Sequence, residues 1–188
     1  MPNSSVQPLI DAYVSMVKER IAWGWSPTLL TFVFKPLGGS DAYAAAVMAN
    51  EVERVYATML TRTSISRRPR TRPAHEHSFW IVCPDYPIFK HERGQLADIS
   101  LNGGRHMHGP TLTPPATRLK ESLTEHVERN QHLYAGGKHP LARLHAIPMT
   151  SRPGFVVDYA MKGLKSSRVN LDDILIFPRT TSELPSHR

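Results

Sequence analysis

The sequence contains a single cysteine, Cys83, among its 188 residues. One thiol cannot form an internal disulfide, which excludes a disulfide-stapled domain and leads us to expect a reducing, cytoplasmic setting. No stretch approaches the roughly 18 consecutive apolar residues of a membrane span. The first twenty residues also lack a basic start followed by an unbroken apolar run, so we expect neither a membrane protein nor a secretory signal.

Internal repeats, low-complexity tracts and glycine-rich phosphate loops are missing as well. The missing phosphate loop removes support for a nucleotide-driven motor. Apolar residues make up 40% of the chain and charged residues 21%, which excludes wholesale disorder. A chain of this length can bury one full hydrophobic core.

Positive charge is in excess, with 23 Lys and Arg against 16 Asp and Glu, a net charge of +7. A basic surface of this size favours a polyanionic partner, because neutralising phosphates releases counterions. The segment 64–73 has two prolines, no acidic residue and four arginines, which are Arg67, Arg68, Arg70 and Arg72. This composition predicts an exposed, extended loop, either a solvated linker or a nucleic-acid contact.

Hydrophobic periodicity predicts helices over 7–22, from a cap at Ser40 to about residue 60, over 117–130, and over 153–166 with Ser151 as cap. Strands are expected over 29–34, 78–83, around 98–101, from 105, over 142–147 and over 173–177, with a turn at 102–104. The order predicts an α+β fold with hairpin-like, antiparallel pairing. We divide the chain into an N-terminal helical extension (1–27), a main domain (28–178) and a tail (179–188).

Two histidines, His106 and His108, flank Met107 in a segment predicted to be a strand. Side chains alternate along a strand, so both imidazoles project from one face, about 7 Å apart. That arrangement suits coordination of one divalent ion, although paired histidines also occur as polar residues on a solvated sheet face. His75 and His77 have the same spacing but adjoin the arginine loop, and we interpret them as a surface feature.

Tyr159 and Lys162 lie on the last predicted helix, about 60° apart around its axis and away from its apolar stripe. A cation beside a phenol favours the phenolate and screens an incoming phosphate, so the tyrosine can act as a nucleophile. A surface tyrosine next to a lysine is the simpler interpretation of this pair alone.

In combination, these features resemble the HUH endonuclease superfamily, and in particular its single-tyrosine initiators of rolling-circle replication. The resemblance rests on an apolar strand (30–34), the histidine motif Gly104-Arg105-His106-Met107-His108-Gly109, and Tyr159-Ala160-Met161-Lys162, in that order. Residues 28–166 carry it. It implies a ferredoxin-like antiparallel sheet with helices packed on it.

The resemblance also implies a chemistry. A divalent metal, Mg²⁺ or Mn²⁺, would be held by His106 and His108 with an acidic third ligand, for which Asp98 is our candidate and Glu92 the alternative. Tyr159 would attack a phosphate of single-stranded DNA and remain bound to its 5′ side, while Lys162 orients the phosphate or stabilises the phenolate. The basic residues expected to contact DNA are Arg67, Arg68, Arg70, Arg72, Arg105 and Lys165.

The process served would be replication of a plasmid, phage or related mobile element. Since no helicase-type domain follows in the sequence, we expect unwinding to come from another protein, such as a separate host helicase, or from supercoiling. Two other classes stay open: a nucleic-acid-binding regulator that retains the fold without catalysis, and a metal-binding or interaction protein without nucleic acid. Pro110, directly after the histidine motif, leads us to expect that this strand lies at a sheet edge or ends early.

Overall fold

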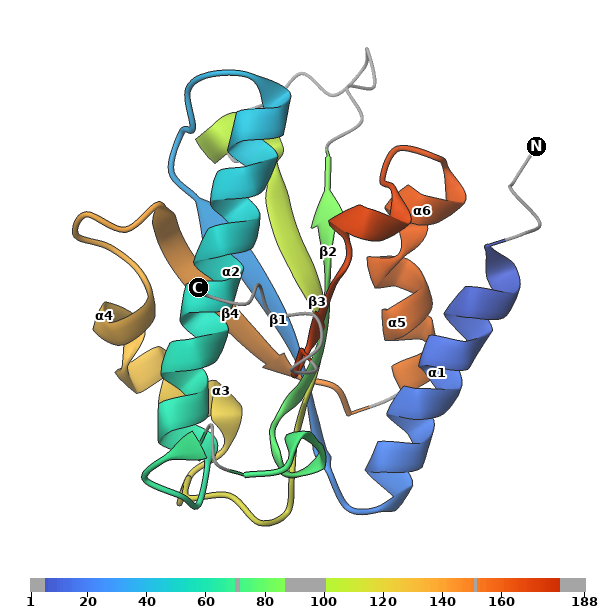
Figure 1. Cartoon of the computed structure of the whole chain (residues 1–188), viewed down its shortest axis with the longest axis vertical. Helices are drawn as coiled ribbons and strands as arrows, with labels where there is room; N and C mark the ends of the chain where they lie inside the picture. Colours follow the sequence, from blue (N-terminus) through green and yellow to red (C-terminus); the bar gives the residue numbers. More distant parts are fainter. Residues whose placement is uncertain (1–5, 70–71, 87–100, 151, 180–188) are drawn as a thin grey trace, which may run out of the picture.

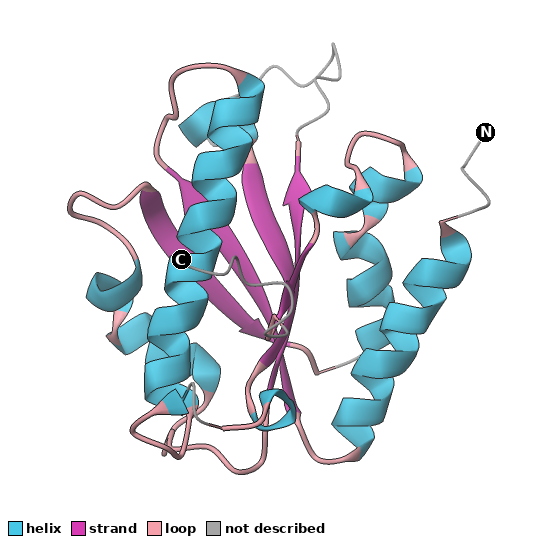
Figure 2. Ribbon diagram, in the orientation of Figure 1, coloured by secondary structure: helices cyan, strands magenta, loops and turns pink. Residues whose placement is uncertain are grey.

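The structure, a computed structural model, describes residues 6–69, 72–86, 101–150 and 152–179. Five strands form one antiparallel sheet in the order β4-β1-β3-β2-β5, with helices on both faces (Figures 1 and 2). The predicted α+β class with a central antiparallel sheet is confirmed. The strands are β1 (Ser26–Phe34), β2 (Phe79–Asp85), β3 (His106–Thr113), β4 (Leu141–Pro148) and β5 (Leu175–Phe177). The helices are α1 (Gln7–Ala22), α2 (Asp41–Thr63), α3 (Leu123–Arg129), α4 (Gln131–Tyr134), α5 (Pro153–Ala160) and α6 (Lys162–Lys165), with short 3-10 turns η2 (Ala74–Glu76), η3 (Leu101–Gly104) and η4 (Leu171–Asp173).

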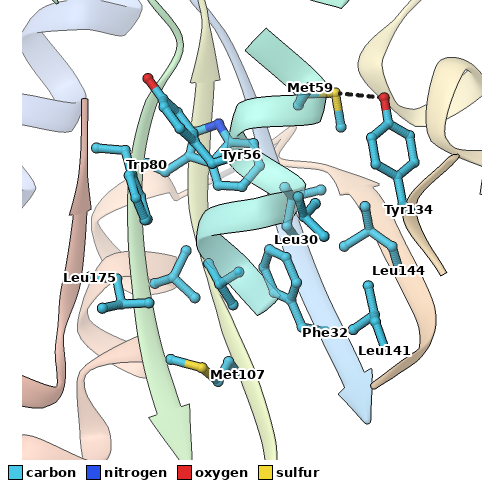
Figure 3. Packing of buried hydrophobic residues seen from close by; sticks show 14 of the residues in the cluster. Leu30, Phe32, Tyr56, Met59, Trp80, Met107, Tyr134, Leu141, Leu144 and Leu175 are labelled. Carbon is cyan, nitrogen blue, oxygen red and sulfur yellow. Dashed lines mark hydrogen bonds between the residues drawn. The ribbon is translucent and has the colours of Figure 1, made fainter. Parts of the chain in front are cut away.

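One face of the sheet packs against α2, α3 and α4. The alternation along β1 directs Leu30, Phe32 and Phe34 into this layer, and each of them is fully buried. All three belong to one cluster with Trp80 of β2 and Met107 of β3, and Figure 3 shows Leu30 and Phe32 on the same side of the sheet as these two residues. Because Met107 points to this side, its neighbours His106 and His108 must point to the other.

The second face of the sheet packs against α1 and α5. Its apolar cluster joins α1, β2, β3, α5 and Met161, through Ile10, Val17, Phe79, Ile81, Cys83, Leu112, Val157 and Met161. Ser26, the first residue of β1, follows α1 closely, so the expected boundary at residue 27 lies inside β1. The N-terminal helix therefore forms part of the core that covers this face.

Several predicted elements have different bounds. β2 continues past Cys83 to Asp85. The helix expected over 117–130 begins only at Leu123, because Ser122 and Glu125 form a reciprocal cap there. Ser40 caps α2 as expected, by accepting from the Tyr43 backbone N–H at 3.2 Å.

The segment around the histidine motif also differs from expectation. Leu101 belongs to η3 rather than to a strand, and the rest of the strand expected around 98–101 lies outside the described residues. Pro110 lies within β3, which is the central strand and runs on to Thr113, so the expectation of an edge position or early end is wrong. The β2–β3 register is the same on both sides of Pro110, at Trp80–Thr111 and at Cys83–His108, and only the two positions opposite Ile81 and Val82 lack a ladder pair, as expected for a residue without an N–H.

The last predicted helix is divided in two. α5 ends at Ala160 and α6 begins at Lys162, with Met161 (φ −91°, ψ 12°) outside helical geometry between them. The residue that precedes α5 is Arg152, whose side chain makes no capping hydrogen bond, and the expected cap Ser151 lies outside the described residues. Among the helices of the described ranges, none is both long enough and apolar enough to cross a membrane.

Candidate functional site

The site lies on the second sheet face, where β2 ends and β3 begins. Asp85 and His106 are direct cross-strand partners, as are Cys83 and His108. Residues opposite each other on neighbouring strands share a face, so this register places one carboxylate and two imidazoles side by side. Their ligand atoms all lie within 4.8 Å of one another, and this group can hold a metal ion.

His108 is more buried than His106, with 5% of its surface exposed. Burial, reinforced by the neighbouring His106, lowers the pKa of His108 to about 4, so the imidazole is neutral at physiological pH. Its Nε2 is buried and has no hydrogen-bond partner. An orphaned basic nitrogen facing a carboxylate and a second imidazole is what a metal ligand requires, so these residues fit a bound ion.

The ring of His106 is oriented by the turn before β3. Its Nδ1 lies 3.0 Å from the Gly104 carbonyl oxygen, and its Nε2 lies 3.4 Å from Asp85 Oδ2. A proton on Nδ1, donated to Gly104, leaves the Nε2 lone pair directed at the cluster. The ring centroids of His106 and His108 are 5.2 Å apart.

Tyr159 approaches this cluster from α5. Val157 and Ala160 are buried against the sheet, whereas Tyr159 is 46% exposed, as the predicted amphipathic pattern requires. The Tyr159 ring lies over His108, with centroids 5.7 Å apart. Tyr159, the nucleophile predicted from the resemblance, therefore lies beside the histidine pair.

Lys162 links the phenol to the carboxylate. Its Nζ lies 3.2 Å from Tyr159 Oη and 2.7 Å from Asp85 Oδ2, and it also lies 4.3 Å from the centre of the Tyr159 ring. Burial opposes the charge of Lys162, but its hydrogen bonds with Asp85 and Tyr159 outweigh that effect and raise its pKa above the usual value.

Asp85 is the site residue that sequence reasoning missed. The candidates for a third ligand, Asp98 and Glu92, lie outside the described residues. Asp85 lies an even number of residues after Phe79, Ile81 and Cys83, so strand alternation could have indicated that its side chain is on the same sheet face as theirs. The predicted strand stopped at Cys83, and this left the carboxylate out of consideration.

The basic residues expected to contact DNA are not gathered at this site. Arg67, Arg68 and Arg72 belong to the segment between α2 and β2. This segment lies at the end of the sheet where β2 begins (Figure 1), whereas the cluster lies where β2 ends. β2 alone separates the two ends by about 20 Å. Arg72 pairs with Glu76, and Arg70 lies outside the described residues.

The other two expected contacts lie closer to the cluster but are paired. Arg105 precedes His106 and pairs with Asp41 at 2.7 Å, and Lys165 of α6 pairs with Asp158. A cavity of about 770 Å³ borders Arg105, and its lining includes Met48 of α2 and Tyr86. None of the three candidate ligands lines this cavity.

Comparison with protein-family models, with curated proteins and with solved structures finds no match for this chain. The geometry of five residues is therefore the basis for assigning a function to this chain: Asp85, His106, His108, Tyr159 and Lys162.

Proposed function

We propose that this protein is a metal-dependent enzyme that nicks and rejoins single-stranded DNA through a 5′-phosphotyrosine intermediate. The observation that carries the proposal is the contact of a half-exposed phenol, Tyr159, with a three-ligand cluster and an ammonium group. Phosphoryl transfer needs a nucleophile and positive charge close to the phosphate. Strands β2 and β3 supply the ligands for a metal cation, and Lys162 of α6 supplies a positively charged ammonium group.

In the proposed reaction, the Tyr159 phenol gives its proton to water and Oη attacks phosphorus. The Oη–P bond forms as the bond from phosphorus to the 3′ oxygen breaks, and that oxygen takes a proton from water to leave as a 3′-hydroxyl. Lys162, 3.2 Å from Oη, stabilises the phenolate and then the new ester. Attack by a 3′-hydroxyl on the phosphotyrosine reverses these steps and joins the strand.

Asp85, His106 and His108 would hold a divalent ion, which we propose to be Mg²⁺ or Mn²⁺. When bound, the ion supplies Lewis-acid stabilisation of the negative charge on the non-bridging phosphate oxygens. Rolling-circle replication of a mobile element is the process that this chemistry serves, because the released 3′-hydroxyl can prime synthesis. A separate helicase would unwind the duplex.

The test is a covalent adduct. The protein is incubated with single-stranded DNA and Mn²⁺, and the products are separated on a denaturing gel. We expect an adduct with the natural chain, none with Tyr159→Phe, and none with the His106→Ala/His108→Ala double variant or with chelator.

Adduct formation that persists in Tyr159→Phe would exclude Tyr159 as the nucleophile. DNA binding without any adduct in the natural chain would instead support the alternative, a non-catalytic nucleic-acid-binding regulator. Arg143→Ala, an exposed substitution on β4, is a control variant that leaves all five site residues in place.

A further inference from the structure

Phe155 is a large apolar side chain that the fold leaves in solvent. It lies in the first turn of α5 and is 63% exposed, whereas Val157, two residues later, is fully buried. A single exposed aromatic residue is ordinary on a protein surface. The position of this one is distinctive, because it lies one helical turn before the phenol of the candidate site.

The Phe155 ring stacks on the Tyr159 ring, with centroids 6.2 Å apart and an angle of 24° between planes. Tyr159 in turn lies 5.7 Å from His108, and His108 lies 5.2 Å from His106. Four rings therefore follow one another from the metal-ligand cluster out to solvent. Phe155 is the last ring of this series.

The first turn of α5, which carries that ring, packs closely against α1. A Cβ on Gly154 would lie 3.1 Å from Val14 Cγ1 of α1, so the two helix backbones approach closely here. The same point lies 3.8 Å from Lys18 Nζ, and exposed Arg152 precedes the helix. Two cations, Lys18 and Arg152, therefore lie near the first turn of α5.

We propose that Phe155 is the stacking platform for a nucleobase of the bound single strand, next to the phosphate that Tyr159 attacks. This inference rests on the proposed function and names the part of the substrate that the site recognises. Every base presents a flat π face, and one base stacked on an aromatic side chain contributes about 1–3 kcal/mol to binding. Lys18 and Arg152 would hold the adjoining phosphates.

The test compares two probes, a twelve-nucleotide oligothymidylate and an abasic strand of the same length. Binding is measured with Mn²⁺ in a Tyr159→Phe background, which keeps the ring and removes the attacking oxygen. Adding Phe155→Ala should weaken oligothymidylate binding by about 5- to 150-fold and leave binding of the abasic strand unchanged. Phe155→Leu should lose as much affinity as Phe155→Ala, and Phe155→Trp should retain it.

Trp23→Ala is the matched control, since Trp23 is 61% exposed but lies after the C-terminus of α1 and takes no part in the series of rings; it should not change binding. An unchanged Mn²⁺ affinity in Phe155→Ala would show that the cluster is intact. Oligothymidylate affinity that is unaffected by Phe155→Ala, or an equal loss for both probes, would overturn the inference alone. A parent chain that binds neither probe would overturn the proposed function together with it.

Discussion

At the residue scale, the ammonium of Lys162 and a metal ion would compete for the same oxygen. Lys162 Nζ lies 2.7 Å from Asp85 Oδ2, and His106 Nε2 lies 3.4 Å from that same atom. A divalent ion bound through Oδ2 would have to displace the ammonium or tolerate its repulsion. Lys162 therefore stabilises the metal-free cluster and opposes metal binding.

The first prediction follows from this competition. Lys162→Met should tighten Mn²⁺ binding by about tenfold or more, because it removes a positive charge close to the ion, while adduct formation falls. Isothermal titration measures the affinity. Lys165→Met is the matched control, since Lys165 pairs with Asp158 outside the cluster. An affinity for Mn²⁺ that is unchanged or weakened in Lys162→Met would contradict the competition.

The second prediction concerns pH. Burial lowers the pKa of His108 from its ordinary value of 6.5 to about 4, so between these values the unfolded chain binds more protons at this residue than the folded chain does. The free energy of unfolding should therefore fall as the pH drops from about 6.5 to about 4, by an amount on the order of 1–3 kcal/mol from this group.

Thermal unfolding with chelator at pH 7 and pH 4.5 measures that change. His108→Gln should lose less stability than the natural chain between the two conditions, because Gln does not titrate. Equal losses in the two proteins would exclude His108 as the source.

Strand alternation predicted that His106 and His108 share one face, and helical periodicity predicted that Tyr159 and Lys162 lie together. The structure has both arrangements and brings the two pairs side by side. Asp85 was missed for a physical reason: it meets His106 through the β2–β3 register, a pairing between residues 21 positions apart. A local pattern carries no information about such a register.

At the element scale, β3 depends on close contact with β2. A Cβ on Gly109 would lie 1.7 Å from the Ile81 carbonyl oxygen, so no side chain fits there without backbone movement. Pro110 follows at once, at positions where β3 makes no ladder pair with β2 although the register stays the same on both sides. Gly109 and Pro110 thus occupy a stretch where the two strands lie very close without pairing.

The third prediction is that Gly109→Ala destabilises the protein by about 2 kcal/mol or more, because the strands must separate locally. Gly38→Ala is the control, since a Cβ there meets nothing within 4 Å. Urea unfolding of both variants gives the comparison. A Gly109→Ala variant as stable as Gly38→Ala would show that the close approach carries no cost.

Element order was predicted better than element ends. The strand over 29–34 and the helix over 7–22 have strong internal periodicity, and both occur in the structure. The helix over 117–130 was overextended because Leu119 fits the same apolar period as Leu123 and Val127. The capping box of Ser122 and Glu125 instead starts α3 at Leu123, although the apolar spacing continues back to Leu119.

At the scale of the whole molecule, the candidate metal ligands and the candidate nucleophile belong to different layers of the fold, the sheet and the helices that cover it. The candidate ligands lie on β2 and β3, whereas Tyr159 lies on α5, which packs beside α1 in the second core. Loosening α1 should thus disturb the nucleophile more than the ligands.

The fourth prediction uses Val17, which is fully buried on α1. Val17→Ala should cost about 2 kcal/mol of stability. At temperatures where the variant remains folded, it should bind Mn²⁺ like the natural chain but form adduct more slowly. Glu19→Ala, an exposed substitution on the same helix, should change neither property, and equal losses of metal binding and adduct formation in Val17→Ala would contradict this division.

Mass spectrometry of the protein after reaction with single-stranded DNA and Mn²⁺ locates the covalent bond that the site is proposed to make. We expect a nucleotide-bearing peptide in which the modified residue is Tyr159, seen only when the metal is present. A phosphodiester attached to any other residue, or formed equally well with chelator, would exclude Tyr159 as the metal-dependent nucleophile.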